Sequence, residues 1–85
     1  MATKPKVLDL FAGCGGLSKG FEDAGFEIAV ANEFWKPAQL TYIKNHPNTE
    51  FIGGDVTESE TKQQIIKAYR KTGCEGIIGG PPCQA

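Results

Sequence analysis

The chain has 85 residues and a formal net charge of −1, and 40% of its residues are hydrophobic. This length allows one small domain with a modest core, and the mixed charges exclude a polycation that holds nucleic acid through phosphate neutralisation alone. No apolar stretch approaches the roughly 20 residues of a membrane span, so we expect no membrane partner and an intracellular protein, cytoplasmic or, in a eukaryote, nuclear.

The first part of the chain predicts a strand, a helix and a second strand. An apolar run at residues 6–11 ends in the glycine cluster GCGG, and a helix is expected to follow it. Gly25 stands where the C-terminal cap of this helix is expected. Residues 27–32 predict the second strand. The apolar residues at helical spacing are Leu17, Phe21 and Ala24.

A second helix is expected to begin at Pro37, because proline suits a first helical turn. Leu40 and Ile43 would lie on one face of it, and His46-Pro47 would close it. His46 is the only histidine in the chain. Its position favours a helix cap over a catalytic base.

The remaining elements are a weak strand, a helix and a fourth strand. Residues 50–53 predict the third strand and residues 75–80 the fourth. Thr57 and Glu60 have the spacing of a capping box, and the helix after them should stop near Gly73. The apolar residues expected on this helix are Ile65, Ile66 and Tyr69.

The order βαβαβαβ, with such apolar strands, favours a parallel sheet with helices on both faces. We expect an α/β protein, the first half of a Rossmann-like doubly wound sheet with strand order 3-2-1-4. Ligands of such sheets bind outside the carboxyl ends of the strands, where the order reverses. The loop after Phe11 should therefore lie beside the loop after Gly80. The fourth strand would be an unprotected apolar edge, and one face of the sheet would lack cover, since only three helices are expected for four strands.

The glycine-rich stretch DLFAGCGG predicts a tight turn that can approach a ligand. The dinucleotide fingerprint needs a third glycine where this chain has Ser18, which disfavours a pyrophosphate site. Glu33 closes the second strand, where a carboxylate can accept hydrogen bonds from ribose hydroxyls. Phe34 could pack on an adenine face and Asp55 could accept from its amine. Alternatively, the two acids are solvated loop residues and Phe34 or Trp35 belongs to the core.

Three cysteines, Cys14, Cys74 and Cys83, form no C-x-x-C pair, which argues against a disulfide framework and a structural zinc site. We expect Cys14 and Cys74 to be small buried hydrophobes. Cys83 follows Pro81-Pro82, whose rings fix the backbone, and lies on a loop at the carboxyl end of a strand. It is the candidate nucleophile, which must react as a thiolate.

Four stretches follow one another along the chain: DLFAGCGGLSKGF, ANEF, GGDV and GGPPCQ. In this order they resemble the N-terminal part of the cytosine-C5 DNA methyltransferase family. The resemblance covers nearly the whole chain, and the first and last motifs together are far more specific than either alone. It implies that Cys83 is the catalytic nucleophile and that S-adenosylmethionine is the cofactor. Glu33 would hold its ribose, Phe34 would stack on adenine, and Asp55 would meet the adenine amine. Pro81 would face the cofactor, and the methionine side would be lined by Phe11, Ala12, Gly13, Gly15, Gly16 and Leu17.

Trp35 departs from the family pattern, which usually has a small polar or acidic residue there, so either Phe34 or Trp35 could stack on adenine. The family continues with further motifs, a target recognition domain and a return segment. The resemblance implies that residues 1–85 are the N-terminal part of the catalytic domain, as a cut product or as one polypeptide of a split enzyme. The implied partners are this remainder and DNA whose target cytosine is flipped out.

Three other functions fit parts of the same pattern. One is a non-catalytic module that binds S-adenosylmethionine or assists assembly. Another is a segment of a transfer RNA cytosine-C5 methyltransferase, which shares the Pro-Pro-Cys-Gln motif. A small nicotinamide-dependent domain is disfavoured by Ser18.

Overall fold

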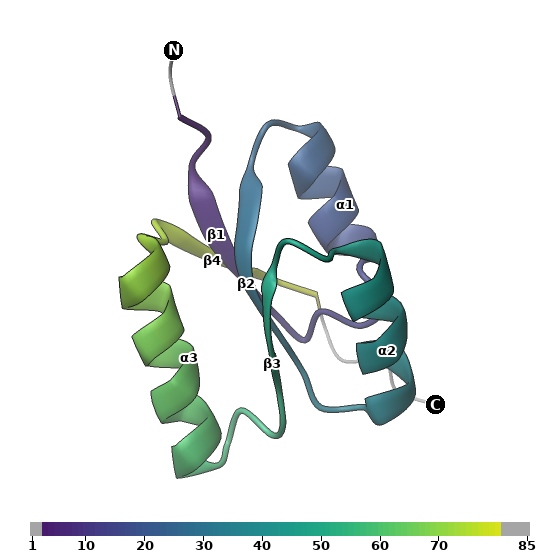
Figure 1. The fold of residues 1–85 in the computed structure, drawn as a ribbon, viewed down its shortest axis with the longest axis vertical. Helices are drawn as coiled ribbons and strands as arrows, with labels where there is room; N and C mark the ends of the chain where they lie inside the picture. Colours follow the sequence, from purple (N-terminus) through teal and green to yellow (C-terminus); the bar gives the residue numbers. More distant parts are fainter. Residues whose placement is uncertain (1–2, 81–85) are drawn as a thin grey trace.

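The computed structural model describes residues 3–80, in which strands and helices alternate in the predicted order (Figure 1). The strands are β1 (Lys6–Leu10), β2 (Glu27–Glu33), β3 (Glu50–Gly53) and β4 (Gly76–Gly79). The helices are α1 (Gly16–Asp23), α2 (Lys36–Asn45) and α3 (Ser59–Thr72). None of these helices within residues 3–80 is long and apolar enough to cross a membrane.

The four strands form one parallel sheet in the order β3-β2-β1-β4, which confirms the predicted topology. β1 and β4 end together, because Leu10 pairs with Gly79. A Cβ atom on Gly79 would stand 2.9 Å from the carbonyl oxygen of Leu10, so only glycine allows this approach. The chain after β1 and the chain after β4 therefore leave the sheet at the same edge.

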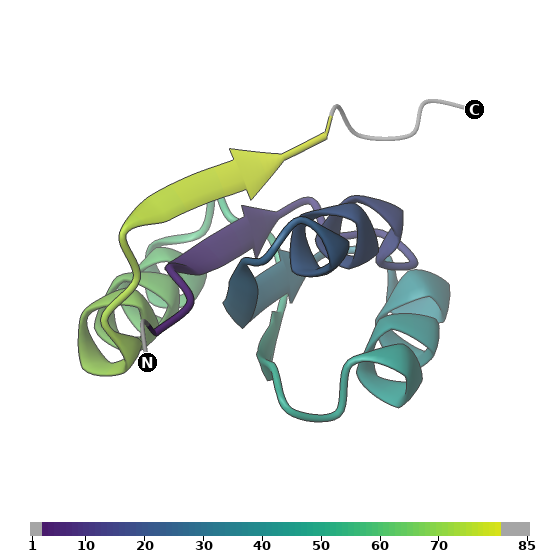
Figure 2. The same ribbon diagram turned by 90° about the horizontal axis from the view of Figure 1, so that it is seen from above.

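The helices cover both faces of the sheet, with α1 and α2 on one face and α3 on the other (Figures 1 and 2). Under α3 the buried core contains Leu8, Val30, Ile52, Ile65 and Ala68. On the other face Ala12, Ala31 and Tyr42 form a second buried cluster with the partly buried Phe51. Burial of each large apolar side chain contributes about 1.5–3 kcal/mol to folding.

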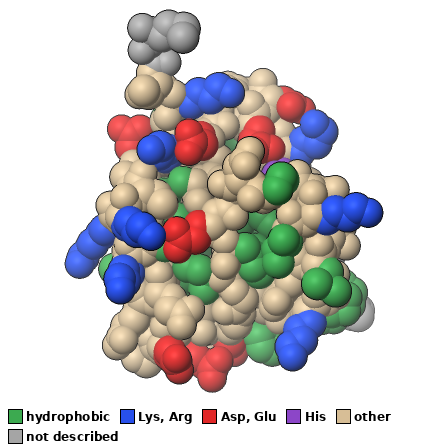
Figure 3. Space-filling model, viewed as in Figure 1, with side chains coloured by type: hydrophobic (Ala, Val, Ile, Leu, Met, Phe, Trp, Pro, Cys, Tyr) green, Lys and Arg blue, Asp and Glu red, His purple; other side chains and the backbone are tan. Residues whose placement is uncertain are grey.

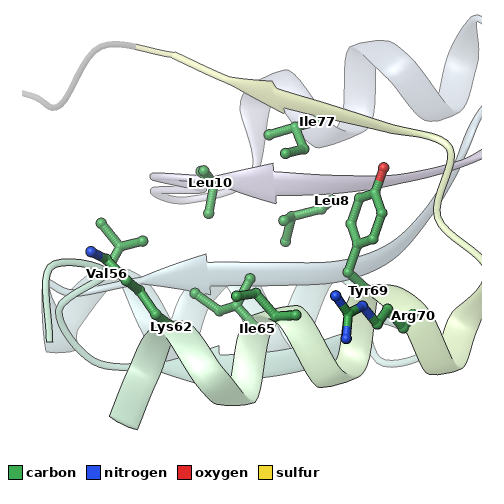
Figure 4. A pocket seen from close by; sticks show the side chains of 9 residues that line it. Leu8, Leu10, Val56, Lys62, Ile65, Tyr69, Arg70 and Ile77 are labelled. Carbon is green, nitrogen blue, oxygen red and sulfur yellow. The ribbon is translucent and has the colours of Figure 1, made fainter. Parts of the chain in front are cut away.

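α3 packs mainly on β2 and β3, so it leaves the β1 and β4 part of this face of the sheet largely uncovered. An apolar groove of about 420 Å³ lies there, and Figure 4 shows side chains from β1, β4 and α3 pointing into it. Ile77 of β4 is 60% exposed. This confirms that β4 is an apolar edge. The predicted lack of cover is confirmed only in part, because α3 covers β2 and β3 on this face and leaves β1 and β4 open. The groove is lined by Leu8, Leu10, Val56, Lys62, Ile65, Ile66, Tyr69, Arg70 and Ile77.

The buried faces of α1 and α2 differ from the predicted ones. On α2, Leu40 is 75% exposed and Ile43 is also exposed, whereas Ala38 and Tyr42 are buried. The prediction followed the largest aliphatic residues, but the side of α2 toward the sheet is occupied by a small residue and a tyrosine whose hydroxyl is hydrogen-bonded. On α1, Ser18 is the buried residue.

The predicted α1 stripe is only partly confirmed. Leu17 is exposed and Ala24 is the exposed C-cap residue, while Phe21 is half-buried against Phe26, with ring centroids 5.3 Å apart. Gly25 follows the cap and has a left-handed φ of 101°.

The predicted capping box at the start of α3 is wrong. The N-cap residue is Glu58, without a side-chain cap bond. Thr57 instead bonds to Asp55, because its backbone N–H and its hydroxyl both donate to Asp55 Oδ1, at 2.8 and 2.7 Å. The predicted stop near Gly73 is confirmed, since Gly73 is the C-cap residue. His46 is the C-cap of α2, and its N–H donates to the Tyr42 carbonyl.

Candidate functional site

The carboxyl edge of the sheet brings together the loop after β1, the end of β2 and the end of β4. The loop begins at Phe11, which has a left-handed φ of 56° although it is not glycine. Such a conformation is strained for a bulky residue and is typical of functional loops. The loop is held by the Ala12 N–H, which donates to the Asn32 carbonyl at 2.9 Å, and by the Gly15 N–H, which donates to the Ala12 carbonyl.

Glu33 joins this loop to the end of β2. The Gly13 N–H donates to Glu33 Oε1 at 2.7 Å, and the Trp35 N–H donates to Oε2 at 2.8 Å. Hydrogen bonds to a carboxylate are stronger than those between neutral groups. The structure therefore brings together two residues that the sequence separates widely and that were predicted to share one site.

Two aromatic residues follow Glu33 directly, and both are exposed. Phe34 is 65% exposed and Trp35 is 62% exposed, so neither belongs to the core. The turn that carries them is fixed by Gln39 Nε2, which donates to the carbonyls of Glu33 and Phe34 at 3.0 and 3.2 Å. Exposed flat rings on a fixed turn offer an apolar surface to a ligand.

Asp55 follows β3, two residues after its end. Hydrogen bonds from the Thr57 backbone N–H and hydroxyl lower the pKa of Asp55, so its carboxylate is ionised at neutral pH. Asn32 of the neighbouring strand fixes the chain before it, because Asn32 Nδ2 donates to the carbonyls of Ile52 and Gly54 at 2.8 and 3.1 Å. The end of β3 is thereby tied to β2.

A buried polar cluster that the sequence did not predict lies beneath the loop. Asp9, Ser18 and Tyr42 are all fully buried and come from β1, α1 and α2. Ser18 Oγ donates to Asp9 Oδ2 at 2.5 Å and lies 2.7 Å from the Tyr42 hydroxyl. Burial raises the pKa of Asp9 and raises the pKa of Tyr42 to about 12. The sequence feature that could have indicated this cluster is Asp9, an acidic residue inside the otherwise apolar end of β1.

α2 also supports the loop from below through Gly15. A Cβ atom on Gly15 would stand 2.6 Å from His46 Nε2 and 3.2 Å from Tyr42 Cδ2, and its φ of 99° is left-handed. The His46 ring stacks on Tyr42 at 4.4 Å, and His46 Nδ1 lies 3.2 Å from Glu22 Oε1. Glycine is therefore needed here both for its conformation and for the space it leaves.

Not every predicted residue has the expected environment. Of the residues predicted to line the cofactor, Ala12 and Gly15 are buried, while Phe11 and Leu17 are 42% and 39% exposed. Cys14 is exposed, so its prediction as a buried hydrophobe is wrong: it lies in the turn between β1 and α1 and not on a buried face. Cys74 is half-buried and packs against the core under α3. Pro81 and Cys83 lie outside the described residues 3–80.

A parallel sheet of order 3-2-1-4 with a glycine loop after its first strand is the arrangement of the first half of a Rossmann-like fold. Comparison with family models gives a match over residues 5–85 to the C-5 cytosine-specific DNA methylase family. The match covers nearly the whole chain, and the chain belongs to this family.

Characterised relatives agree with the family match. The chain is 47% identical over 83 residues to type II methyltransferase M.NgoPII of Neisseria gonorrhoeae, covering 94% of this chain and 22% of that protein. It is 51% identical over 81 residues to type II methyltransferase M.HgiGI of Herpetosiphon aurantiacus, covering 93% and 60%. It is 38% identical over 90 residues to DNA (cytosine-5)-methyltransferase 1 of Gallus gallus, covering 95% and 6%.

A solved structure is also similar. The PH0226 protein from Pyrococcus horikoshii OT3 superposes with a TM-score of 0.52 at 37% identity, over 68% of this chain and 29% of that protein. In each of these comparisons the chain spans less than two thirds of its relative. The similarity therefore covers one part of a larger protein in each case.

Proposed function

We propose that this chain supplies the cofactor site and the nucleophile of a DNA (cytosine-5-)-methyltransferase and needs the rest of the catalytic domain for activity. The observation that carries this proposal is the 2.7 Å bond between the Gly13 N–H and Glu33 Oε1. It unites the glycine loop with an acid that ends the neighbouring strand, in a chain of the C-5 cytosine-specific family. We call the chain together with that remainder the complemented enzyme.

The residues at this edge suit S-adenosylmethionine, which when bound supplies an electrophilic methyl group. Glu33 has both oxygens held by backbone N–H groups, so its carboxylate is fixed and can still accept from ribose hydroxyls. Phe34 or Trp35 offers a ring for adenine, and the ionised Asp55 offers an acceptor for its amine. The methionine side would be lined by Phe11, Ala12, Gly13, Gly15, Gly16 and Leu17, with Pro81 facing the cofactor.

Cys83 is the proposed nucleophile. Chain connectivity supports this role, since three residues span at most about 11 Å and Gly80 directly follows β4 at the edge that holds the glycine loop. The thiol and the loop would then serve one cleft. The two cysteines within residues 3–80 do not compete for the role, because Cys74 packs against the core and Cys14 is not part of a Pro-Pro-Cys-Gln motif.

The reaction needs a thiolate because C5 of cytosine is a poor carbon nucleophile. In the proposed step the Cys83 thiolate adds to C6 and forms an S–C6 bond, and the electron pair of the C5–C6 double bond makes C5 nucleophilic. C5 would then accept the methyl group that the cofactor supplies, and the electron pair of the broken S–CH3 bond would stay on the cofactor sulfur, which becomes a neutral thioether. Loss of the C5 proton to water or to a base of the complemented enzyme would restore the double bond, break the S–C6 bond and release the thiolate.

DNA binding is assigned to the complemented enzyme, which must extrude the target base from the duplex. The chain has 9 basic and 10 acidic residues. On the face shown in Figure 3, basic and acidic side chains are interspersed. This charge pattern supports a remainder that supplies the phosphate contacts.

The test is transfer of a labelled methyl group to duplex DNA and to transfer RNA by the chain alone and by the complemented enzyme. We expect transfer to DNA by the complemented enzyme only. Methylation of DNA by the chain alone would refute the need for a remainder. Transfer to transfer RNA instead of DNA would refute the proposed substrate, and cofactor binding without any transfer would indicate a binding module.

A further inference from the structure

The two ends of the glycine loop are joined by a single side-chain hydrogen bond. Asp9 lies on β1 before the loop, and Ser18 lies on α1 after it. The bond from Ser18 Oγ to Asp9 Oδ2 therefore ties together the two ends of the segment 10–17, which contains the glycine loop. Both side chains are fully buried, so water does not compete for the bond.

Tyr42, on α2, belongs to the same hydrogen-bonded group, and we call Asp9, Ser18 and Tyr42 together the clasp. Ser18 has one hydroxyl proton, which it donates to Asp9, so the Tyr42 hydroxyl at 2.7 Å donates to Ser18 Oγ. The chain of hydrogen bonds runs from α2 through α1 to β1. It therefore fixes where α1 begins, and with it the exit of the loop.

Within residues 3–80, Ser18 is the side chain that donates a hydrogen bond to the buried Asp9 carboxylate. The other oxygen of Asp9, Oδ1, is buried without a hydrogen-bond partner among residues 3–80. Loss of the Ser18 hydroxyl would leave both oxygens unpaired, which favours a shift of the strand end or uptake of a proton. Tyr42 has a second contact with the loop, because its ring lies against Gly15.

We propose that Ser18 and Tyr42 are positioning residues that act through Asp9 to hold the glycine loop in the conformation in which Gly13 reaches Glu33. Neither side chain is exposed, so neither is proposed to touch the ligand. The inference rests on the proposed function only for the identity of that ligand. The clasp itself is a property of the protein without cofactor.

The first test is amide hydrogen exchange of the complemented enzyme without cofactor. Ser18→Ala and Tyr42→Phe should speed exchange in residues 11–17 by roughly three- to tenfold, the loss of about one buried hydrogen bond. The matched controls on the other face are Tyr69→Phe and Thr72→Val, the latter removing a bond to the Ala68 carbonyl, and should leave the loop unchanged. If Ser18→Ala fails to fold, Tyr42→Phe, which keeps the ring against Gly15, carries the test.

The second test is calorimetric titration with S-adenosylhomocysteine, together with steady-state kinetics. Both variants should raise Kd and the KM for the methyl donor by roughly three- to tenfold, with kcat changed less than about twofold. The double variant should be no worse than Ser18→Ala, because Tyr42 acts through Ser18. Unchanged loop exchange in Tyr42→Phe, or additive effects, would overturn the clasp. A wild type that binds no cofactor would refute the proposed function, while the exchange result would still decide the clasp.

Discussion

Gly13 and Glu33 are joined by a 2.7 Å hydrogen bond from a loop amide to a carboxylate oxygen, across the ends of two neighbouring strands. The bond fixes the loop after β1 relative to the end of β2. Because the second oxygen of Glu33 accepts the Trp35 N–H, the carboxylate also fixes the turn that carries the two exposed rings. One side chain therefore organises most of the proposed cofactor site.

Replacing Glu33 should weaken cofactor binding. In the complemented enzyme, Glu33→Ala should lower the binding free energy of S-adenosylmethionine by about 1–3 kcal/mol, since hydrogen bonds to a charged acceptor are lost and donors are left unpaired. Glu33→Gln, which keeps one acceptor oxygen, should lose less. Calorimetry decides, and an unchanged affinity in Glu33→Ala would show that the ribose lies elsewhere.

A side chain at Gly15 should disrupt the loop. Gly15→Ala places a Cβ atom against the His46 ring at a left-handed φ, and we expect it to lower the free energy of unfolding by about 1–3 kcal/mol. Gly16→Ala is the matched control, because nothing lies within 4 Å of a Cβ there. Urea unfolding of both variants gives the comparison. Equal stability of the two would contradict the close packing of α2 against the loop.

Asp9 should give the protein a distinctive pH dependence. Burial raises its folded-state pKa above the ordinary value of 3.8, so the folded state binds the proton more tightly than the unfolded state. Its contribution to stability is therefore full below pH 3.8 and falls as the pH rises through the folded-state pKa. Asp9→Asn removes this titration. The difference in unfolding free energy, wild type minus variant, should fall as the pH rises from 4 toward neutrality in urea titrations, and a constant difference would contradict the assignment.

The open groove beside β4 should make the isolated chain associate. Ile77 is exposed at an apolar edge with no following element in residues 3–80 to cover it. We expect gel filtration of the isolated chain to show self-association, and Ile77→Lys to reduce both this and binding to the remainder. Leu40→Lys, at an exposed site on the other face, is the control. A stable monomer unaffected by either change would show that the edge needs no neighbour.

The strand order could be predicted because it depends on local pattern and on general rules of parallel sheets. The roles of the candidate site residues stay predictions. Apolar runs, glycine clusters and the crossover topology place Gly13 near Glu33 without any coordinates. The helix faces were harder, since a side chain as polar as Ser18 is buried only because Asp9 and Tyr42 reach it from other elements. The capping box failed for a similar reason, because Thr57 bonds to Asp55 in preference to the helix start.

The central claim is that Cys83 forms the covalent bond to cytosine, and trapping on DNA that contains 5-fluorocytosine tests it most directly. The fluorine at C5 cannot leave as a proton, so the adduct persists and can be seen as a protein–DNA band after denaturation. In the complemented enzyme, Cys83→Ser should abolish this band, while Cys14→Ser and Cys74→Ser should retain it. Trapping by a folded Cys83→Ser variant, or equal loss in all three folded variants, would contradict the account.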